Sequence, residues 1–172
     1  MPVDMKQLIA QLAEGEILSR ETTRNAFLYM MNGDATGPQI GAFLIALRVR
    51  GERLDEITGA VEAMRSKALG IKAPKGSVDT CGTGGDTAGT YNISTAAAIV
   101  LAACGVPVAK HGNRAVSSKS GSADVLETLG VNINADMAIV KNCLKSLGIS
   151  FLMATRHHSA ARHVGPASAS LG

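Results

Sequence analysis

The sequence predicts an α/β protein with a small N-terminal helical domain, residues 1–71, followed by the first part of a mainly parallel-sheet α/β domain, residues 72–172. Two observations support this prediction. Apolar residues recur at helical spacing throughout the first part. After Lys72, short apolar runs alternate with helical patterns, which indicates crossover connections between parallel strands. No closing strand is evident before the last residue, so we expect the second domain to be truncated.

Four helices are expected in the first domain. Ser19 and Thr36 are N-cap candidates, because each hydroxyl can accept a backbone N–H of the helix that follows. The third helix is apolar around most of its circumference, which predicts a central place in a small bundle. The expected helices span 4–15, 19–33, 37–52 and 54–69. The third carries Phe43, Leu44, Ile45 and Leu47, and the fourth is expected to turn Ile57, Val61, Met64 and Leu69 toward the core.

Composition and charge exclude several classes of function. The formal charge of +3 is small and scattered, and the chain has two tyrosines, three phenylalanines and no tryptophan, so no nucleic-acid-binding surface is indicated. Cys81, Cys104 and Cys143 form no C-x-x-C pair, which indicates neither a zinc site nor a disulfide framework. No signal peptide or membrane span is evident, and we expect a cytoplasmic protein.

The second domain is expected to alternate strands and helices. Strands are predicted at 77–80, 105–110 and 149–153, and helices at 94–104, 122–130 and 136–148. A glycine-rich stretch follows each of the first two strands. Candidate functional residues therefore gather at the carboxyl ends of neighbouring strands.

The first stretch reads "DTCGTGGDTAGTYNIST", residues 79–95. Its glycines allow the backbone N–H groups to approach an anion closely. Asn92, Ser94 and Thr95 then open an alanine-rich helix, where they can cap the helix or bind a ligand at its positive end. A tight strand-to-helix turn with an ordinary cap is the alternative. The stretch lacks the Gly-Lys-Ser/Thr ending of a P-loop.

The second stretch, "KHGNRAVSSKSGSADVLETLG", spans residues 110–130 and supplies positive charge. Its cations and hydroxyls suit a pyrophosphate, because hydrogen bonds to charged groups contribute about 1.5–3 kcal/mol each. A solvated basic loop is the alternative. The cations and polar residues of the stretch are Lys110, His111, Asn113, Arg114 and Lys119, and the first turn of the helix that follows carries Ser120, Ser122 and Asp124.

Together, "GTGGD", "NIST" and the second stretch resemble the anthranilate phosphoribosyltransferase family, over essentially the whole chain but only the N-terminal half of the family's length. The resemblance implies transfer of the phosphoribosyl group of 5-phosphoribosyl 1-pyrophosphate (PRPP) to anthranilate in tryptophan biosynthesis, with Mg²⁺ and a homodimer formed through the N-terminal helices. The helix around Phe43 and Leu47 is the expected source of the dimer surface. Implied PRPP-binding residues are Gly82, Gly85, Asp86, Thr90, Asn92, Ser94, Thr95, Lys110, Asn113, Arg114, Ser117, Ser118 and Ser122. Gly82, His111, Asn113 and His158 are expected to line the anthranilate site, and Ser94 to ligate Mg²⁺.

The implied chemistry needs little acid–base help. Mg²⁺ and Lys110 would stabilise the leaving pyrophosphate, and the neutral aryl amine of anthranilate would attack as the nucleophile. No general base is therefore assigned, and His111 is a candidate for orientation or proton handling. His157, His158 and His163 cluster in the sequence, but their spacing favours a substrate-lining His158 over a metal site.

Two departures from the family pattern leave alternatives open. Ser168 stands where the family places an arginine that grips the anthranilate carboxylate, and the family's Asp-Glu metal pair is missing. Asp55-Glu56 starts a helix and is no substitute. A paralogous PRPP-using transferase with another acceptor, and a non-catalytic helical dimerisation fragment, are therefore the competing hypotheses.

Overall fold

A computed structural model describes residues 3–82, 91–115, 120–157 and 159–171, without the side chains of three residues near the C-terminal end. The chain divides into two compact units, residues 1–68 with 158–172, and residues 69–157. The first unit is helical, and the second combines helices with a parallel pair of strands, which confirms the predicted fold class. Within the described residues, no helix has both the length and the apolar character that a membrane crossing requires.

Four helices begin the first unit, and the side chains of Ser19 and Thr36 cap the second and third of them as the sequence predicts. The Ser19 hydroxyl accepts the N–H of Thr22 at 3.1 Å. Thr36 and Gln39 form a reciprocal capping box. These helices are α1 (Met5–Ala13), α2 (Arg20–Asn32), α3 (Gly37–Arg50) and α4 (Leu54–Lys67).

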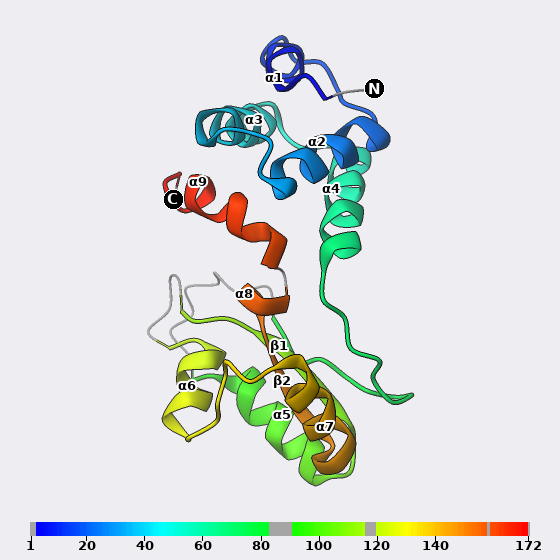
Figure 1. The fold of residues 1–172 in the computed structure, drawn as a ribbon, viewed down its shortest axis with the longest axis vertical. Helices are drawn as coiled ribbons and strands as arrows, with labels where there is room; N and C mark the ends of the chain where they lie inside the picture. Colours follow the sequence, from blue (N-terminus) through cyan, green and yellow to red (C-terminus); the bar gives the residue numbers. More distant parts are fainter. Residues whose placement is uncertain (1–2, 83–90, 116–119, 158, 172) are drawn as a thin grey trace. The chain divides into compact units, whose positions relative to one another are not determined.

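The core of this unit lies between α1, α2 and α3. Phe43 is fully buried and meets Phe27 edge-on, with ring centroids 6.1 Å apart. Met30 and Ile40 are buried in the same cluster, so one face of α3 contributes to the core. Figure 1 shows α2 and α4 side by side. Gly59 makes this approach possible, because a Cβ at that position would lie 2.3 Å from the Arg20 carbonyl oxygen.

The predicted inner face of α4 is wrong. Ile57, Val61 and Met64 are exposed by 51%, 39% and 38%, whereas Gly59 and Ala63 face α2. The small residues form the buried side because they let the two helix backbones come close, which the larger apolar residues would prevent. Leu69, the last residue of the predicted inner face, is also exposed. Ile45 of α3 is exposed as well.

Glu56 is also on the buried side of α4. Its carboxylate forms an ion pair with Arg50 and accepts the backbone N–H groups of Leu18 and Arg53, both at 2.9 Å. Burial by itself raises the pKa of Glu56, but these hydrogen bonds outweigh it and the pKa is lowered. Glu56 therefore joins α4 to α3 and to the segment that precedes α2.

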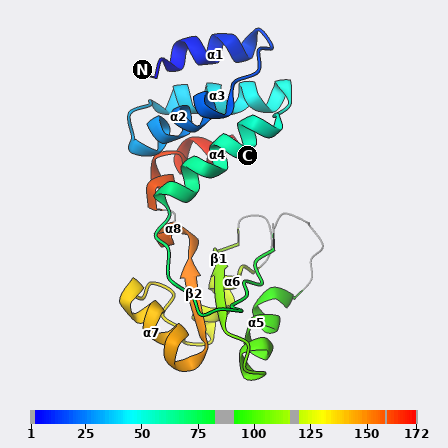
Figure 2. The same ribbon diagram turned by 90° about the vertical axis from the view of Figure 1, so that its right-hand side faces the viewer.

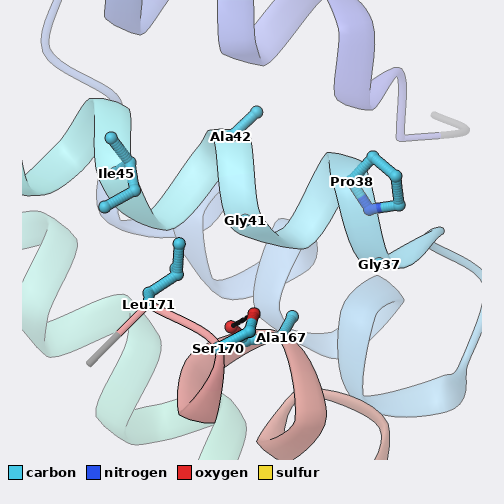
Figure 3. Close-up of a pocket in the computed structure, with 8 residues that line it drawn as sticks. All are labelled: Gly37, Pro38, Gly41, Ala42, Ile45, Ala167, Ser170 and Leu171. Carbon is cyan, nitrogen blue, oxygen red and sulfur yellow. Dashed lines mark hydrogen bonds between the residues drawn. The ribbon is translucent and has the colours of Figure 1, made fainter.

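The C-terminal segment belongs to the helical unit, although residues 72–172 were expected to form one domain. The 3-10 helix η1 (Ser159–His163) packs on α2 and α4, and α9 (Gly165–Ala169) packs on α3. The His163 ring lies against Gly33, whose φ of +87° ends α2 in the left-handed region. An apolar pocket of about 510 Å³ lies between α3 and the α9 region. Figure 3 shows Ile45 and Leu171 on its wall.

The second unit contains two parallel strands, β1 (Val108–Gly112) and β2 (Ile149–Met153), in register from Val108 opposite Ile149 to Gly112 opposite Met153. The strand expected at 77–80 is reduced to a single bridge, in which Val78 pairs with Val108. Figure 2 shows α5 (Ile93–Ala103) next to β1 and α7 (Met137–Leu147) next to β2. The remaining helices are α6 (Ser122–Thr128) and the short α8 (Ala154–His157).

One side of this unit is apolar and open. An apolar cavity of about 330 Å³ lies between α5, α6, α7 and β2. Residues on its wall keep much of their surface exposed, including Ile99 at 45% and Leu147 at 68%. Apolar exposure of this extent marks a surface that normally packs against other protein.

Candidate phosphate-binding site

The described residues include nine of the predicted site positions. They lie at the carboxyl ends of the segment 77–80 and of β1, and at the first turns of α5 and α6. They are Gly82, Asn92, Ser94, Thr95, Lys110, His111, Asn113, Arg114 and Ser122. The predictions for Gly85, Asp86, Thr90, Ser117, Ser118 and His158 lie outside the described residues.

Asn92 joins the two glycine-rich stretches. Its side-chain oxygen accepts the N–H of Thr95 at 3.1 Å, which makes it the N-cap of α5. The same oxygen accepts the Ser122 hydroxyl at 3.5 Å, and the Asn92 amide donates to the Ser120 carbonyl at 3.5 Å. The starts of α5 and α6 are thus held together by one side chain. The positive end of the eleven-residue helix α5 faces this junction.

Lys110 supplies a buried cation next to this junction. It lies on β1, is only 2% exposed, and its Nζ donates to Thr80 Oγ1 at 3.5 Å. Burial lowers the pKa of Lys110, while the nearby Cys81 and Asp79 act in the opposite direction. A bound anion would offset part of this desolvation penalty, because its negative charge would stabilise the charged form of the buried lysine.

Thr80 connects Lys110 to α5. Its hydroxyl donates to the Ser94 carbonyl at 2.8 Å and accepts from Lys110. The Thr95 hydroxyl is buried and has no hydrogen-bond partner among the described residues. Buried hydroxyls usually find partners, so a polar group without one beside a buried cation is a feature that ligand binding would explain.

Arg114 has acidic partners. Its guanidinium contacts Asp124 at 3.0 Å and Glu127 at 2.8 and 3.0 Å. The hydrogen bonds that Arg114 donates, first to Glu127 and then to Asp124, raise the pKa of Arg114. The predicted phosphate contact of Arg114 would therefore compete with two carboxylates, and we expect Arg114 to act mainly by holding α6.

Asp124 is a residue that the sequence reasoning assigned to no site. Its Oδ2 accepts the backbone N–H groups of Ala115 and Gly121, each at 2.9 Å. These hydrogen bonds lower the pKa of Asp124, with Ala115 contributing most. A Cβ on Gly121 would lie 2.3 Å from the Ala115 nitrogen, so only glycine fits. Asp124 therefore acts as a clamp that holds Ala115 to the start of α6. The sequence signal for such a clamp is an acid three residues after a helix N-cap.

His111 lies on the other side of β1 from Lys110. Its backbone N–H donates to Asp79 Oδ1 at 3.1 Å, and its ring meets that of His157 edge-on at a centroid separation of 5.5 Å. Burial first, and then His157, lower the pKa of His111, while Asp79 raises it. The imidazole is therefore mainly neutral near pH 7, which suits substrate orientation better than acid catalysis. Asn113 is exposed, and its side chain accepts the N–H of Arg114 at 2.9 Å.

The chain thus combines a helical bundle with an α/β unit in which two glycine-rich stretches meet at Asn92, next to a buried lysine. The α/β-domain model of the glycosyl transferase family matches residues 74–172, and the helical-bundle model of the same family matches residues 6–68. The chain therefore belongs to the glycosyl transferase family.

Individual relatives narrow the similarity further. The chain is 62% identical over 169 residues to the anthranilate phosphoribosyltransferase of Rhodospirillum rubrum, which covers 98% of this chain and 49% of that protein. For the Azospirillum brasilense enzyme the identity is 61% over 163 residues, with 95% and 46% covered. The chain thus spans about half the length of the curated relatives it matches.

Solved structures of enzymes with the same name have a similar fold. The anthranilate phosphoribosyltransferase of Thermus thermophilus superposes with a TM-score of 0.87 at 43% identity, covering 96% of this chain and 50% of that one. The Saccharomyces cerevisiae enzyme, in complex with PRPP and Mg, gives a TM-score of 0.82 at 27% identity, with 98% and 51% covered.

Proposed function

We propose that this chain provides the N-terminal half of an anthranilate phosphoribosyltransferase, which transfers the phosphoribosyl group of PRPP to the amino group of anthranilate. The products would be N-(5-phosphoribosyl)anthranilate and pyrophosphate, within tryptophan biosynthesis in the cytoplasm. The observation that carries the proposal is the junction of the two glycine-rich stretches at Asn92, next to the buried Lys110. The similarity to enzymes of that name supports it.

Lys110 and the first turn of α5 would hold the phosphates. Lys110 brings positive charge from a site with little water, where an ionic hydrogen bond is stronger than in solution. Thr95, whose buried hydroxyl lacks a partner in the described part of the chain, would donate to a phosphate oxygen. In this proposal Asn92 and Ser122 position the two stretches, and the implied contacts of Gly82, Gly85, Asp86, Thr90, Ser117 and Ser118 complete the PRPP site.

The donor set partly fits Mg²⁺. Ser94 offers a hard hydroxyl oxygen on the first turn of α5, and Mg²⁺ commonly takes one or two protein oxygens with substrate phosphates and water. When bound, Mg²⁺ would neutralise negative charge that develops on the leaving pyrophosphate. The protein's own part is to orient PRPP through α5 and to place the Lys110 cation near the leaving group.

The acceptor would bind beside His111 at the carboxyl end of β1, next to the proposed phosphate site. Anthranilate carries a neutral aryl amine, so attack on the ribose carbon needs no strong protein base. A mainly neutral His111 would orient this amine together with Asn113, Gly82 and His158. Positioning of the two substrates would then supply much of the rate enhancement.

The proposed activity also needs the part of the relatives that this chain does not span. The open apolar side of the second unit suits that role, because its cavity wall leaves Ile99 and Leu147 exposed. We propose that the C-terminal half of a full-length enzyme covers this side and supplies the rest of the active site. Burial of this surface would add about 25 cal/mol for each Å² removed from water.

A homodimer through the N-terminal helices is part of the proposal, but the surface differs from the one expected. Phe43 and Leu47 are buried in their own unit and are not available to a partner. The exposed apolar residues nearby are Ile45 and Val49 of α3 and Ile57 and Val61 of α4. These residues are the better candidates for the dimer surface.

A paralogous transferase with a different acceptor is the second candidate. Ser168 favours it, because this residue is exposed on α9 and its hydroxyl cannot pair with a carboxylate as the expected arginine would. A non-catalytic dimerisation fragment is the third hypothesis, and the exposed apolar residues of α3 and α4 are the observation behind it.

Isothermal titration calorimetry of this chain with PRPP and Mg²⁺, and then with anthranilate, tests the proposal. We expect PRPP to bind and the Lys110→Met variant to bind at least about tenfold more weakly, with the exposed Lys145→Met of α7 as the matched control. An absence of PRPP binding at millimolar concentration would contradict both transferase hypotheses for this chain. PRPP binding without any response to anthranilate would favour the paralogue, or a loss of acceptor binding because this chain spans only half of its relatives.

A further inference from the structure

Three side chains with metal-binding atoms meet beside β1, outside the phosphate-binding junction. They are Asp79, Cys81 and His111, and the ligand atoms that they offer all lie within 4.8 Å of one another. Cys81 Sγ is 3.9 Å from His111 Nδ1. No spacing motif connects these residues in the sequence, since about thirty positions separate His111 from the other two. The fold brings them together by pairing the segment around Val78 with β1.

The backbone around the three residues is already organised. Asp79 Oδ1 accepts the N–H of Cys81 at 2.9 Å and the N–H of His111 at 3.1 Å. One carboxylate thus fixes the main chain at both of the other residues. Asp79 and Cys81 are exposed and His111 is half-buried, so a hydrated ion can reach the cluster from solvent.

The separation between the sulfur and the imidazole nitrogen suits a small tetrahedral ion. Zinc binds thiolate sulfur at about 2.3 Å and imidazole nitrogen at about 2.0–2.1 Å, which places two such ligands about 3.6 Å apart. The observed 3.9 Å between Cys81 Sγ and His111 Nδ1 closes to that value with a shift of a few tenths of an ångström. Exposed side chains make such a shift by small rotations about χ1.

We propose that Asp79, Cys81 and His111 form a binding site for a borderline-soft transition-metal dication of the Zn²⁺ type. One sulfur, one nitrogen and one oxygen ligand match this class of ion and not Mg²⁺, which prefers oxygen ligands. Binding forms a metal–sulfur bond and releases the thiol proton of Cys81 to solvent. Three protein ligands leave the fourth position to water or to a small anionic ligand.

The metal site and the proposed acceptor site share His111. An ion held there would occupy the imidazole that we propose as a contact of the acceptor. Zn²⁺ would then compete with anthranilate and not with PRPP. The Lys110 and His111 side chains alternate in direction along β1, but Lys110 is still close enough to interact electrostatically with Cys81 and Asp79.

Cobalt(II) titration of the 172-residue chain tests the site directly. We expect the thiolate-to-cobalt charge-transfer absorption to appear and saturate at one equivalent, to disappear on adding Zn²⁺, and to persist in excess Mg²⁺. Cys81→Ser and Asp79→Asn should weaken binding at least about tenfold. Cys104→Ser is the matched control, because Cys104 is also exposed but does not belong to the cluster of metal-binding side chains.

A second measurement needs no variant and so does not depend on correct folding of a mutant. Zn²⁺ should slow alkylation of Cys81 by iodoacetamide, followed by peptide mass spectrometry, and should leave alkylation of Cys104 unchanged. Equal protection of both cysteines, or a cobalt absorption that Cys104→Ser removes as completely as Cys81→Ser, would overturn the proposal. So would the absence of any thiolate-to-cobalt absorption in the unmodified chain.

Discussion

Glu56 and Arg50 form an ion pair almost wholly excluded from solvent, with 1% and 10% of their side chains exposed. Removing one partner of such a pair leaves a buried charge without compensation, which typically costs about 3–5 kcal/mol. We expect Glu56→Ala to lower the free energy of unfolding by about that amount, as measured by urea denaturation. Glu62→Ala is the control, because the Arg20–Glu62 pair is exposed. Equal losses for the two variants would contradict the assignment.

The same carboxylate predicts how stability depends on pH. The pKa of Glu56 is lower in the folded chain than the ordinary value, because its hydrogen bonds outweigh the effect of burial. Its contribution is therefore fully present above the unfolded pKa of about 4.3, and it is lost as the pH falls through the folded pKa. Denaturation between pH 7 and pH 3 should show a steeper loss for the unmodified chain than for Glu56→Gln. Parallel curves would count against this role.

Gly59 and Gly41 predict opposite effects of alanine. At Gly59 a Cβ would lie 2.3 Å from the Arg20 carbonyl oxygen, so Gly59→Ala should push α2 and α4 apart and cost about 1–3 kcal/mol. At Gly41, inside α3, a Cβ would meet nothing within 4 Å. Gly41→Ala should therefore stabilise the chain by up to about 1 kcal/mol through helix propensity. Thermal unfolding followed by circular dichroism compares the two, and a stabilising Gly59→Ala would refute the close-packing argument.

Asp124 should protect the amides of Ala115 and Gly121 from hydrogen exchange. Both N–H groups donate to its carboxylate at 2.9 Å, so Asp124→Ala should speed exchange at these two positions, as measured by NMR. Asp136→Ala is a suitable control, because Asp136 is an exposed acid that pairs with Arg156 and caps no amide with its side chain. Unchanged exchange in Asp124→Ala would show that the clamp is not formed in solution.

Local rules recover most of the fold from the sequence. Ser19 and Thr36 cap helices as predicted, because capping depends on residues three positions apart. The inner face of α4 was mispredicted, because the pattern of large apolar residues gives no weight to Gly59 or to a buried Glu56. The expected strand at 77–80 became one bridge because the described part of the sheet pairs Val78 with Val108 alone.

In the candidate site, too, local features can be predicted from the sequence and contacts between distant residues cannot. Asn92 and Lys110 are found from motifs, because each lies within a short and distinctive stretch. The partners that give them their roles are distant in sequence, as when Thr80 meets both Lys110 and Ser94. The cluster of Asp79, Cys81 and His111 is likewise hidden, since a ligand set of three residue types from two segments leaves no periodic signal.

The Thr80 hydroxyl fixes the direction of the hydrogen bonds that connect Lys110 to Ser94. Its single proton is committed to the Ser94 carbonyl, so toward Lys110 the oxygen can only accept. The same arrangement therefore serves a charged or a neutral lysine, and a change of protonation at Lys110 need not reorient its neighbour. Serine at position 80 would preserve both hydrogen bonds. Valine, which has a similar shape, would remove them and leave Lys110 and the Ser94 carbonyl without this partner.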